Sequence, residues 1–138
     1  MNITIMGEPV AQGRPRFARQ GNFVRAYDPE HSRTWKQTAR LMAIDQMSGK
    51  PLLSQALVVR IDVYRGVPRS WSRKRRELAL GGEVRPTTKP DADNYIKAVQ
   101  DACNGVVWQD DSQIVCVTAA KWYSDRPRVE IDISEAMG

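Results

Sequence analysis

The sequence is poor in the residues that build disulfide scaffolds, thiolate metal sites and membrane spans. It has two cysteines and one histidine, and Cys103 and Cys116 do not form a C-x-x-C pair. Neither a disulfide framework nor a zinc site is therefore expected, and His31 is interpreted as a surface or capping residue. No apolar run approaches the roughly 18 residues of a membrane-spanning helix, and MNITIMGEPV lacks the pattern of a secretory signal. We expect reduced thiols, a cytoplasmic location and no membrane partner.

Length and charge favour one domain with a polyanionic partner. A chain of 138 residues is long enough to bury a hydrophobic core. No internal repeat, low-complexity tract or long linker divides it, so a single domain over residues 1–138 is expected. The 21 lysines and arginines exceed the 16 aspartates and glutamates, which gives a net charge of +5. Such a balance favours nucleic acid or an anionic membrane as partner without identifying either.

Hydrophobic periodicity predicts an α+β domain, built on a small mixed β-sheet with flanking helices. Alternating apolar residues predict strands over about 3–5, 56–65, 113–123 and 128–133. Capping signals predict helices from Asp28-Pro29-Glu30 to Ser48-Gly49, from Ser70 to Gly81-Gly82, and over about 93–103. Residues 11–27 are rich in arginine and are expected to form a loop or hairpin. Because helices and strands do not alternate strictly, the α+β class is preferred.

The most informative stretch is PDADNYIKAVQDACNGVVWQDDSQ, residues 90–113, where aspartates crowd around a single lysine, Lys97. The aspartates are Asp91, Asp93, Asp101, Asp110 and Asp111. Clustered carboxylates repel one another, and a hard cation such as Mg²⁺ removes that repulsion while leaving room for water and a substrate phosphate. An acidic cluster inside a cationic protein therefore indicates a metal-dependent nuclease.

The spacing of these residues is compatible with two interpretations. On a helix, Asp93, Lys97 and Asp101 share one face at i, i+4 and i+8, and Asp91 lies just before the first turn. A strand after Asp110-Asp111 would bring one of that pair back towards Asp91 and Asp93. The structural alternative is that the first acids complement the helix dipole and that Asp93, Lys97 and Asp101 form a surface ion-pair ladder. Spacing alone leaves both open.

From Lys89 to Ile114 the sequence resembles the signature of RusA-type Holliday junction resolvases, a family with many prophage members. The family pattern is K-P-D-x-D-N-x-x-K, then D-A-x-N-G, then D-D-x-Q-[IV], and the chain matches it with few departures. The likeness extends more loosely to GRPRF, VRAYDPE and the last two strands, and so covers most of the chain. One departure is Cys103, where the pattern usually has leucine, and we interpret it as core packing.

The resemblance implies a RusA-like fold and a Mg²⁺-dependent crossover junction endodeoxyribonuclease. The family works as a homodimer in DNA recombination and repair, and makes paired symmetric nicks in four-way junctions. Asp91, Asp93 and Asp111 match its metal-binding carboxylates and Lys97 its catalytic lysine, so these four are the expected catalytic residues. Asp101 is expected to be structural. Because a junction has approximate two-fold symmetry, a C₂ dimer would present two sites to opposed strands.

Two cationic segments flank the acidic region and are expected to contact DNA phosphates as a set. They comprise Arg14 and Arg16 in GRPRF, and Arg73, Lys74, Arg75 and Arg76 in SRKRRE. For any single residue, a solvated surface position is the alternative. Trp71 and Trp108 border the basic helix and the D-D pair, where base stacking is an alternative to packing. Trp35 and Trp122 are expected in the core.

A non-catalytic DNA-binding protein of the same fold, recognising branched DNA, is the main alternative function. Basic segments and a compact dimer would suffice for it. A calcium-binding EF-hand is excluded because Tyr95 and Ile96 occupy positions that require a ligand and a glycine. A P-loop nucleotide hydrolase is excluded because no G-x-x-x-x-G-K-[ST] occurs.

Overall fold

The fold is of the expected α+β class with a small mixed sheet. The computed structural model describes residues 1–13, 16–21, 23–27 and 30–137, with only the backbone described over 16–20 and 23–27. Its elements in chain order are β1 (Asn2–Met6), β2 (Arg16–Gln20), β3 (Phe23–Tyr27), α1 (Glu30–Met47), β4 (Leu57–Gly66), α2 (Arg73–Leu80), α3 (Ala92–Cys103), the 3₁₀ turn η1 (Asp111–Gln113), β5 (Ile114–Ser124) and β6 (Arg128–Glu135). None of the helices in these described ranges is long and apolar enough to cross a membrane.

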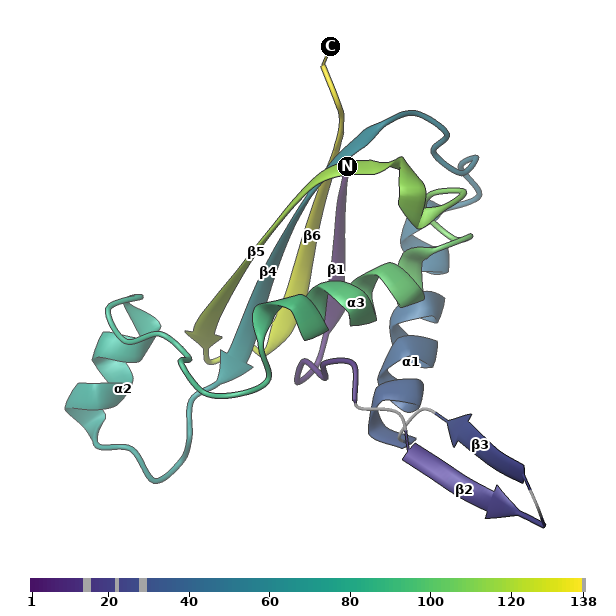
Figure 1. The fold of residues 1–138 in the computed structure, drawn as a ribbon. Coiled ribbons are helices and arrows are strands. Elements are labelled where there is room, and N and C mark those ends of the chain that lie inside the picture. Colours follow the sequence, from purple (N-terminus) through teal and green to yellow (C-terminus); the bar gives the residue numbers. More distant parts are fainter. Residues whose placement is uncertain (14–15, 22, 28–29, 138) are drawn as a thin grey trace.

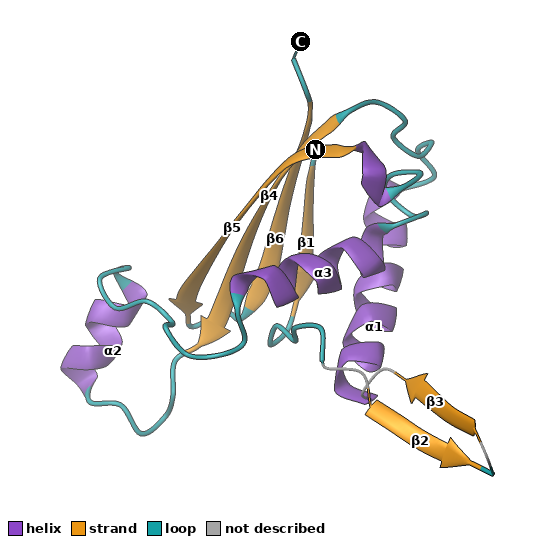
Figure 2. Ribbon diagram, viewed as in Figure 1, coloured by secondary structure: helices purple, strands orange, loops and turns teal. Residues whose placement is uncertain are grey.

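Four strands form the main sheet in the order β1-β6-β4-β5, and β2 and β3 form a separate hairpin. Strands β4 and β5 run parallel, whereas β6 is antiparallel to both β1 and β4. Helices α1 and α3 cover one face of the sheet, α2 lies beyond the ends of β4 and β5, and the hairpin extends away near the start of α1 (Figures 1 and 2). The acidic helix α3 is thus held directly against the sheet.

Every second residue of β1, β4 and β6 faces the helices, which follows from the two-residue repeat of a strand. The buried strand residues are Ile3, Ile5, Leu57, Val59, Ile61, Val63, Val129, Ile131 and Ile133. On the opposite face of β4, Arg60 and Asp62 form an ion pair at 3.0 Å. A slip of one residue would exchange the two faces, so burial of this apolar set fixes the strand register.

Helix α1 packs through an apolar stripe along one side. Trp35, Ala39, Ala43 and Met47 are buried at intervals of four residues. The helix ends where Ser48 and Gly49 take positive φ values of 50° and 75°, the left-handed conformation that commonly closes a helix. The expected start at Asp28-Pro29 lies outside the described residues. α1 presents a narrow apolar face to β1 and to α3.

Two details differ from the sequence expectations. Trp122 lies at the β5 edge of the sheet and is only partly buried: its Nε1–H donates to Asp62 Oδ1 at 2.9 Å, and Arg85 stacks on its ring at 3.4 Å. Ser72 caps α2 by accepting the N–H of Arg75, so the cap lies two residues after the expected one, Ser70. Trp108 follows the packing alternative and is fully buried.

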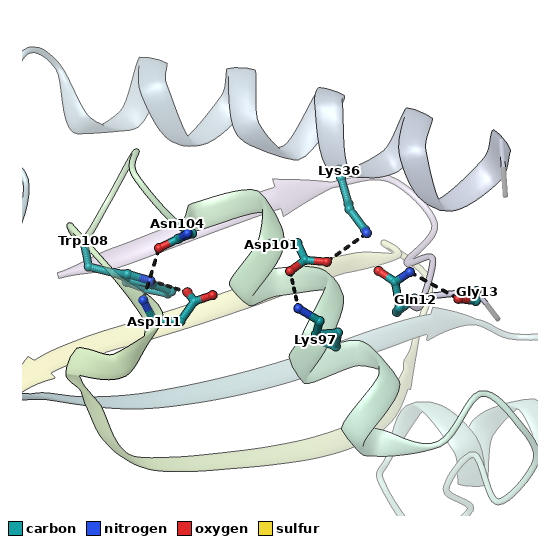
Figure 3. Close-up of polar contacts among 8 residues, drawn as sticks. All are labelled: Gln12, Gly13, Lys36, Lys97, Asp101, Asn104, Trp108 and Asp111. Atoms are coloured by element: carbon teal, nitrogen blue, oxygen red, sulfur yellow. Dashed lines mark hydrogen bonds and ion pairs between the residues drawn. The ribbon is translucent and has the colours of Figure 1, made fainter. Parts of the chain in front are cut away.

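A polar bridge ties α3 to α1 (Figure 3). Asp101 accepts from Lys36 Nζ of α1 at 2.9 Å and from Lys97 Nζ, one turn back on α3, at 2.7 Å. Burial alone would raise the pKa of Asp101, but the hydrogen bonds from Lys97 and Lys36 outweigh it and lower the pKa. Asp101 is therefore stabilised as an anion and fixes the two helices relative to each other.

Replacing Asp101 with asparagine is expected to destabilise the protein by about 1–2 kcal/mol at neutral pH, because the bridge between α1 and α3 loses its anion. A lowered pKa in the folded state gives stability that is present above the ordinary value of 3.8 and lost below it. The difference from wild type, measured by urea unfolding, should therefore shrink as the pH falls below that value. Asp125→Asn, at an exposed loop position, should show no such difference.

Candidate functional site

The N-terminal end of α3 carries two exposed carboxylates. Asp91 is the N-cap residue, with an extended backbone and no side-chain capping hydrogen bond, and Asp93 lies in the first turn. Among the described residues, neither side chain forms a hydrogen bond or an ion pair. A plain capping role therefore does not account for Asp91. Both carboxylates are exposed and available to a ligand.

Cations from two parallel strands anchor the loop that leads into Asp91. Lys121 Nζ of β5 donates to the carbonyls of Thr88 and Pro90 at 3.0 Å each. Arg65 of β4 donates to Thr88 O at 3.4 Å and to Lys89 O at 3.5 Å. Because Pro90 directly precedes Asp91, these bonds fix where the acidic end of α3 lies. They also place positive charge beside it.

The GRPRF segment leaves from the same end of α3. The backbone N–H of Gln12 donates to Asn94 O in the first turn of the helix, at 3.0 Å. The chain then leads into the hairpin, whose first strand begins at Arg16. Arg14 and the side chain of Arg16 lie outside the described residues, so their DNA contacts stay a prediction. The position of Gln12 shows that this cationic segment starts beside Asp91 and Asp93.

Lys97 lies on the exposed face of α3, as its spacing predicts. Its side chain is 58% exposed, and its ammonium contacts Asp101, four residues later, rather than Asp93, four residues earlier. Half of the suggested ion-pair ladder is therefore present. The ammonium of Lys97 therefore lies along the helix surface next to Asp101. Asp93 is on the same face of α3 but does not pair with Lys97.

Asp111 lies at the other end of α3. Its backbone N–H donates at 3.1 Å to the side-chain oxygen of Asn104, which is the C-cap residue of α3, and its carboxylate accepts from Trp108 Nε1–H at 2.7 Å (Figure 3). The twelve residues of α3 span about 18 Å. Within one chain Asp111 is therefore not beside Asp91 and Asp93.

One chain does not provide the expected ligand set for a single metal ion. No group of three His, Cys, Asp or Glu side chains in the part of the chain that the structure describes is placed to hold a metal ion. The carboxylates form a line instead: Asp91 and Asp93 at one end of α3, Asp101 along it, and Asp111 at the other end. Assignment of Asp91, Asp93 and Asp111 to metal binding stays a prediction.

The two members of the D-D pair have different surroundings. Asp110 caps η1: its side chain accepts the N–H of Ser112 at 3.0 Å, its own N–H donates to Gln113 Oε1 at 2.8 Å, and the hydrogen bonds from Ser112 lower its pKa. Burial raises the pKa of Asp111, the charges of Asp101 and Asp110 add to that effect, and the bond from Trp108 and the charge of Lys97 oppose it. Asp110 is thus a structural cap, whereas burial disfavours the charged form of Asp111.

Sequence reasoning missed the residues that hold these groups in place. Lys36 has no signal in the sequence, because a lysine on an amphipathic helix is commonplace. Asn104 belongs to the N-G of the family pattern, and its side chain also positions Asp111. The three-residue spacing of Trp108 and Asp111 is visible in the sequence, but it does not reveal the bond from the indole N–H to the carboxylate.

The basic helix α2 stands apart from the acidic face. Its four basic residues, Arg73, Lys74, Arg75 and Arg76, are all exposed. Arg75 stacks on Trp71 at 3.9 Å, and Trp71 meets Tyr123 of β5 edge-on at 5.0 Å, which anchors the helix to the sheet. Arg73 pairs with Glu77 at 3.4 Å while 93% exposed, so water screens that pair strongly. We call α2 with these residues the α2 arm.

Asp111→Asn is expected to raise stability at neutral pH, and Asp110→Asn to lower it. The raised pKa of Asp111 means that its contribution to stability is present below the ordinary value of 3.8 and lost as the pH rises through the folded value. The lowered pKa of Asp110 gives the opposite sign. Thermal unfolding of both variants at neutral and acidic pH checks this, and equal shifts in one direction would contradict it.

Comparison with known proteins identifies the family. A model described as Endodeoxyribonuclease RusA matches residues 6–134. An uncharacterized protein, YqaN, of Bacillus subtilis (strain 168) is 43% identical over 137 residues, which cover 98% of this chain and 96% of that protein. The crossover junction endodeoxyribonuclease rusA of Lactococcus phage r1t is 42% identical over 50 residues, 36% of this chain and 38% of that protein. The family match covers nearly the whole length, and the chain therefore belongs to the RusA family of endodeoxyribonucleases.

Proposed function

We propose that the protein is a Mg²⁺-dependent endonuclease that resolves four-way DNA junctions by paired symmetric nicks, acting in the cytoplasm as a homodimer of single-domain chains. The observation that carries the proposal is the pair of uncapped, exposed carboxylates, Asp91 and Asp93, at the cation-flanked end of α3 in a chain of the RusA family. The name of the phage relative supports the choice of substrate.

A single chain leaves the proposed Mg²⁺ site incomplete, and this favours the dimer. Mg²⁺ prefers oxygen ligands and keeps several waters, so Asp91 and Asp93 supply part of a ligand set. Asp111 of the same chain lies at the far end of α3 and does not complete it. In the proposal a second copy brings its Asp111 to this end of the helix. The two-fold symmetry of a junction requires two such sites.

Lys97 is assigned to charge stabilisation. Its ammonium lies one turn from Asp93 on the same exposed face, and Asp101 holds it there at 2.7 Å. A fixed cation beside a scissile phosphate stabilises the negative charge that develops in the transition state without reorganising at that moment. In the reaction Asp101 acts through that cation, in addition to joining α3 to α1.

The α2 arm and the GRPRF segment are assigned to the DNA backbone. Phosphate contacts from arginine and lysine supply affinity that does not depend on sequence and that decreases steeply with salt. The exposed residues of α2 match that role, and the arm lies beyond the strand ends that carry Arg65 and Lys121 (Figure 1). The α2 arm, Arg65 and Lys121 therefore put positive charge at the end of the sheet from which the loop leads into Asp91.

Asp93→Asn is expected to abolish nicking of a synthetic four-way junction in Mg²⁺ while junction binding is kept or improved, because the substitution removes one negative charge and a ligand oxygen of the proposed site. Gel assays of cleavage and of binding measure the two effects separately. Asp45→Asn, at an exposed position of α1, is the charge-matched control and should cut normally. If parent and variants all bind the junction and none cuts it, the protein is the non-catalytic alternative.

The double substitution of Lys74 and Arg76 with alanine is expected to weaken binding to junctions and to plain duplexes alike. If both residues contact phosphates, the slope of log affinity against log salt should fall by about 2. Arg33 and Lys50 are equally exposed, and their double alanine variant controls for net charge. Fluorescence anisotropy over a salt series measures both. Equal slopes for the two variants would remove the α2 arm from the interface.

A further inference from the structure

The segment of residues 85–90, which we call the strap, lies between α2 and α3 and is tied to the last part of β5. At its start, Arg85 donates to Lys121 O at 2.7 Å and stacks on the ring of Trp122 at 3.4 Å. At its end, Lys121 Nζ donates to Pro90 O at 3.0 Å. One residue of β5 therefore holds both ends of the strap, one with its backbone and the other with its side chain.

The register of the sheet explains why Lys121 reaches the strap. Lys121 lies opposite Val63 of the parallel neighbour β4, and opposed residues of adjacent strands point to the same face of a sheet. Val63 is buried under the helices, so the side chain of Lys121 points to the helix face as well. Val117 and Ala119 precede it on that face and pack against the core. This apolar row of β5 thus ends in an ammonium group beside the N-terminus of α3.

The ammonium of Lys121 bonds the backbone and not a carboxylate. Among the described residues it forms no ion pair, and its bonds go to the carbonyls of Thr88 and Pro90, at 3.0 Å each. A charged donor makes stronger hydrogen bonds than a neutral one. The contacts that Arg65 adds to the same segment are longer, at 3.4 and 3.5 Å. The chain that enters α3 is therefore held mainly by the ammonium of Lys121.

Asp91 depends on this contact more than Asp93 does. Asp93 lies within the first turn of α3 and keeps its place as part of the helix. Asp91 precedes the helix, has an extended backbone and lacks a side-chain capping bond. Its carbonyl accepts the N–H of Asn94 at 3.1 Å, and the carbonyl directly before it is held by Lys121. The position of the first carboxylate relative to the second therefore depends on Lys121.

We propose that Lys121 is a positioning residue that prepares the acidic end of α3 for Mg²⁺. The inference rests on the Mg²⁺ site of the proposed function and adds a residue that acts through the backbone beside Asp91, not on the metal. Ligands that are held in place before the metal arrives bind it more tightly, because less conformational entropy is lost on binding. Lys121 holds the peptide group before Asp91, and Arg85 in turn holds the backbone of Lys121.

Lys121→Met removes the ammonium and keeps a side chain of similar length. Titration calorimetry of the whole protein with Mg²⁺ alone should show binding weakened at least about tenfold, and half-maximal nicking of a four-way junction should need correspondingly more Mg²⁺. The nicking rate at saturating Mg²⁺ should approach that of the parent, because the ligands are unchanged. Lys121→Arg, which keeps a charged donor, should restore most of the loss. Lys50→Met, at an exposed position, is the charge-matched control and should behave as the parent does.

Hydrogen exchange without metal or DNA separates positioning from a general loss of stability. Exchange of the backbone amides over residues 85–94 should accelerate in Lys121→Met and in Arg85→Met, while exchange in α1 stays at the parent level. Arg85→Met removes the bond to Lys121 O and leaves the ammonium in place. It therefore decides the same comparisons if Lys121→Met does not fold.

Three results would overturn the proposal: unchanged Mg²⁺ binding in the folded variant, a lower rate at saturation without weaker Mg²⁺ binding, or equal acceleration of exchange in α1. A parent that binds no Mg²⁺ would overturn it together with the proposed function. A parent that binds Mg²⁺ and cuts no junction would refute the nuclease alone, and calorimetry would still decide the role of Lys121.

Discussion

The candidate site depends on the burial of one face of α3. Tyr95, Ala98, Val99 and Ala102 must pack on α1 and the sheet, and this forces Asp93, Lys97 and Asp101 outwards. The apolar side of the helix thus decides where its charges stand. Because a helix places residues four apart above one another, the outward residues form a line along its axis. That line gives one chain a row of charges rather than a closed pocket.

Electrostatics divides the acids into two kinds. Asp101 and Asp110 are held by donors that lower their pKa, and both stabilise the fold, one by joining helices and the other by closing η1. Asp111 has a raised pKa, and Asp91 lacks a capping bond, so folding gains little from either charge. Carboxylates that the fold does not need as anions are the better candidates for a functional role, and the proposed assignment from the family pattern names Asp91 and Asp111 among them.

Local patterns in the sequence predicted most of the fold and only part of the site. Alternating apolar residues predicted β4 and β6, and capping signals predicted the helices, because each signal depends on residues close together in the sequence. Strand order could not be predicted, since it depends on contacts between segments far apart in the chain. The same reason explains why Asp111 was expected near Asp91: the turn through Trp108 returns the chain to the C-terminal end of α3. The position of Trp122 at the sheet edge, where a core position was expected, also reflects tertiary packing.

The side-chain amide of Gln46, on α1, forms two hydrogen bonds with the backbone of Thr4 at the β1 edge of the sheet, and this pairing has a consequence for aggregation. A sheet with two exposed edges can pair with further copies at both edges and grow into fibres. A sheet with one protected edge can pair with only one further copy. Placing an amide from α1 against β1 makes the first strand a terminus for self-association. Loss of the Gln46 side chain would expose the β1 edge of the sheet to edge-to-edge pairing with another copy.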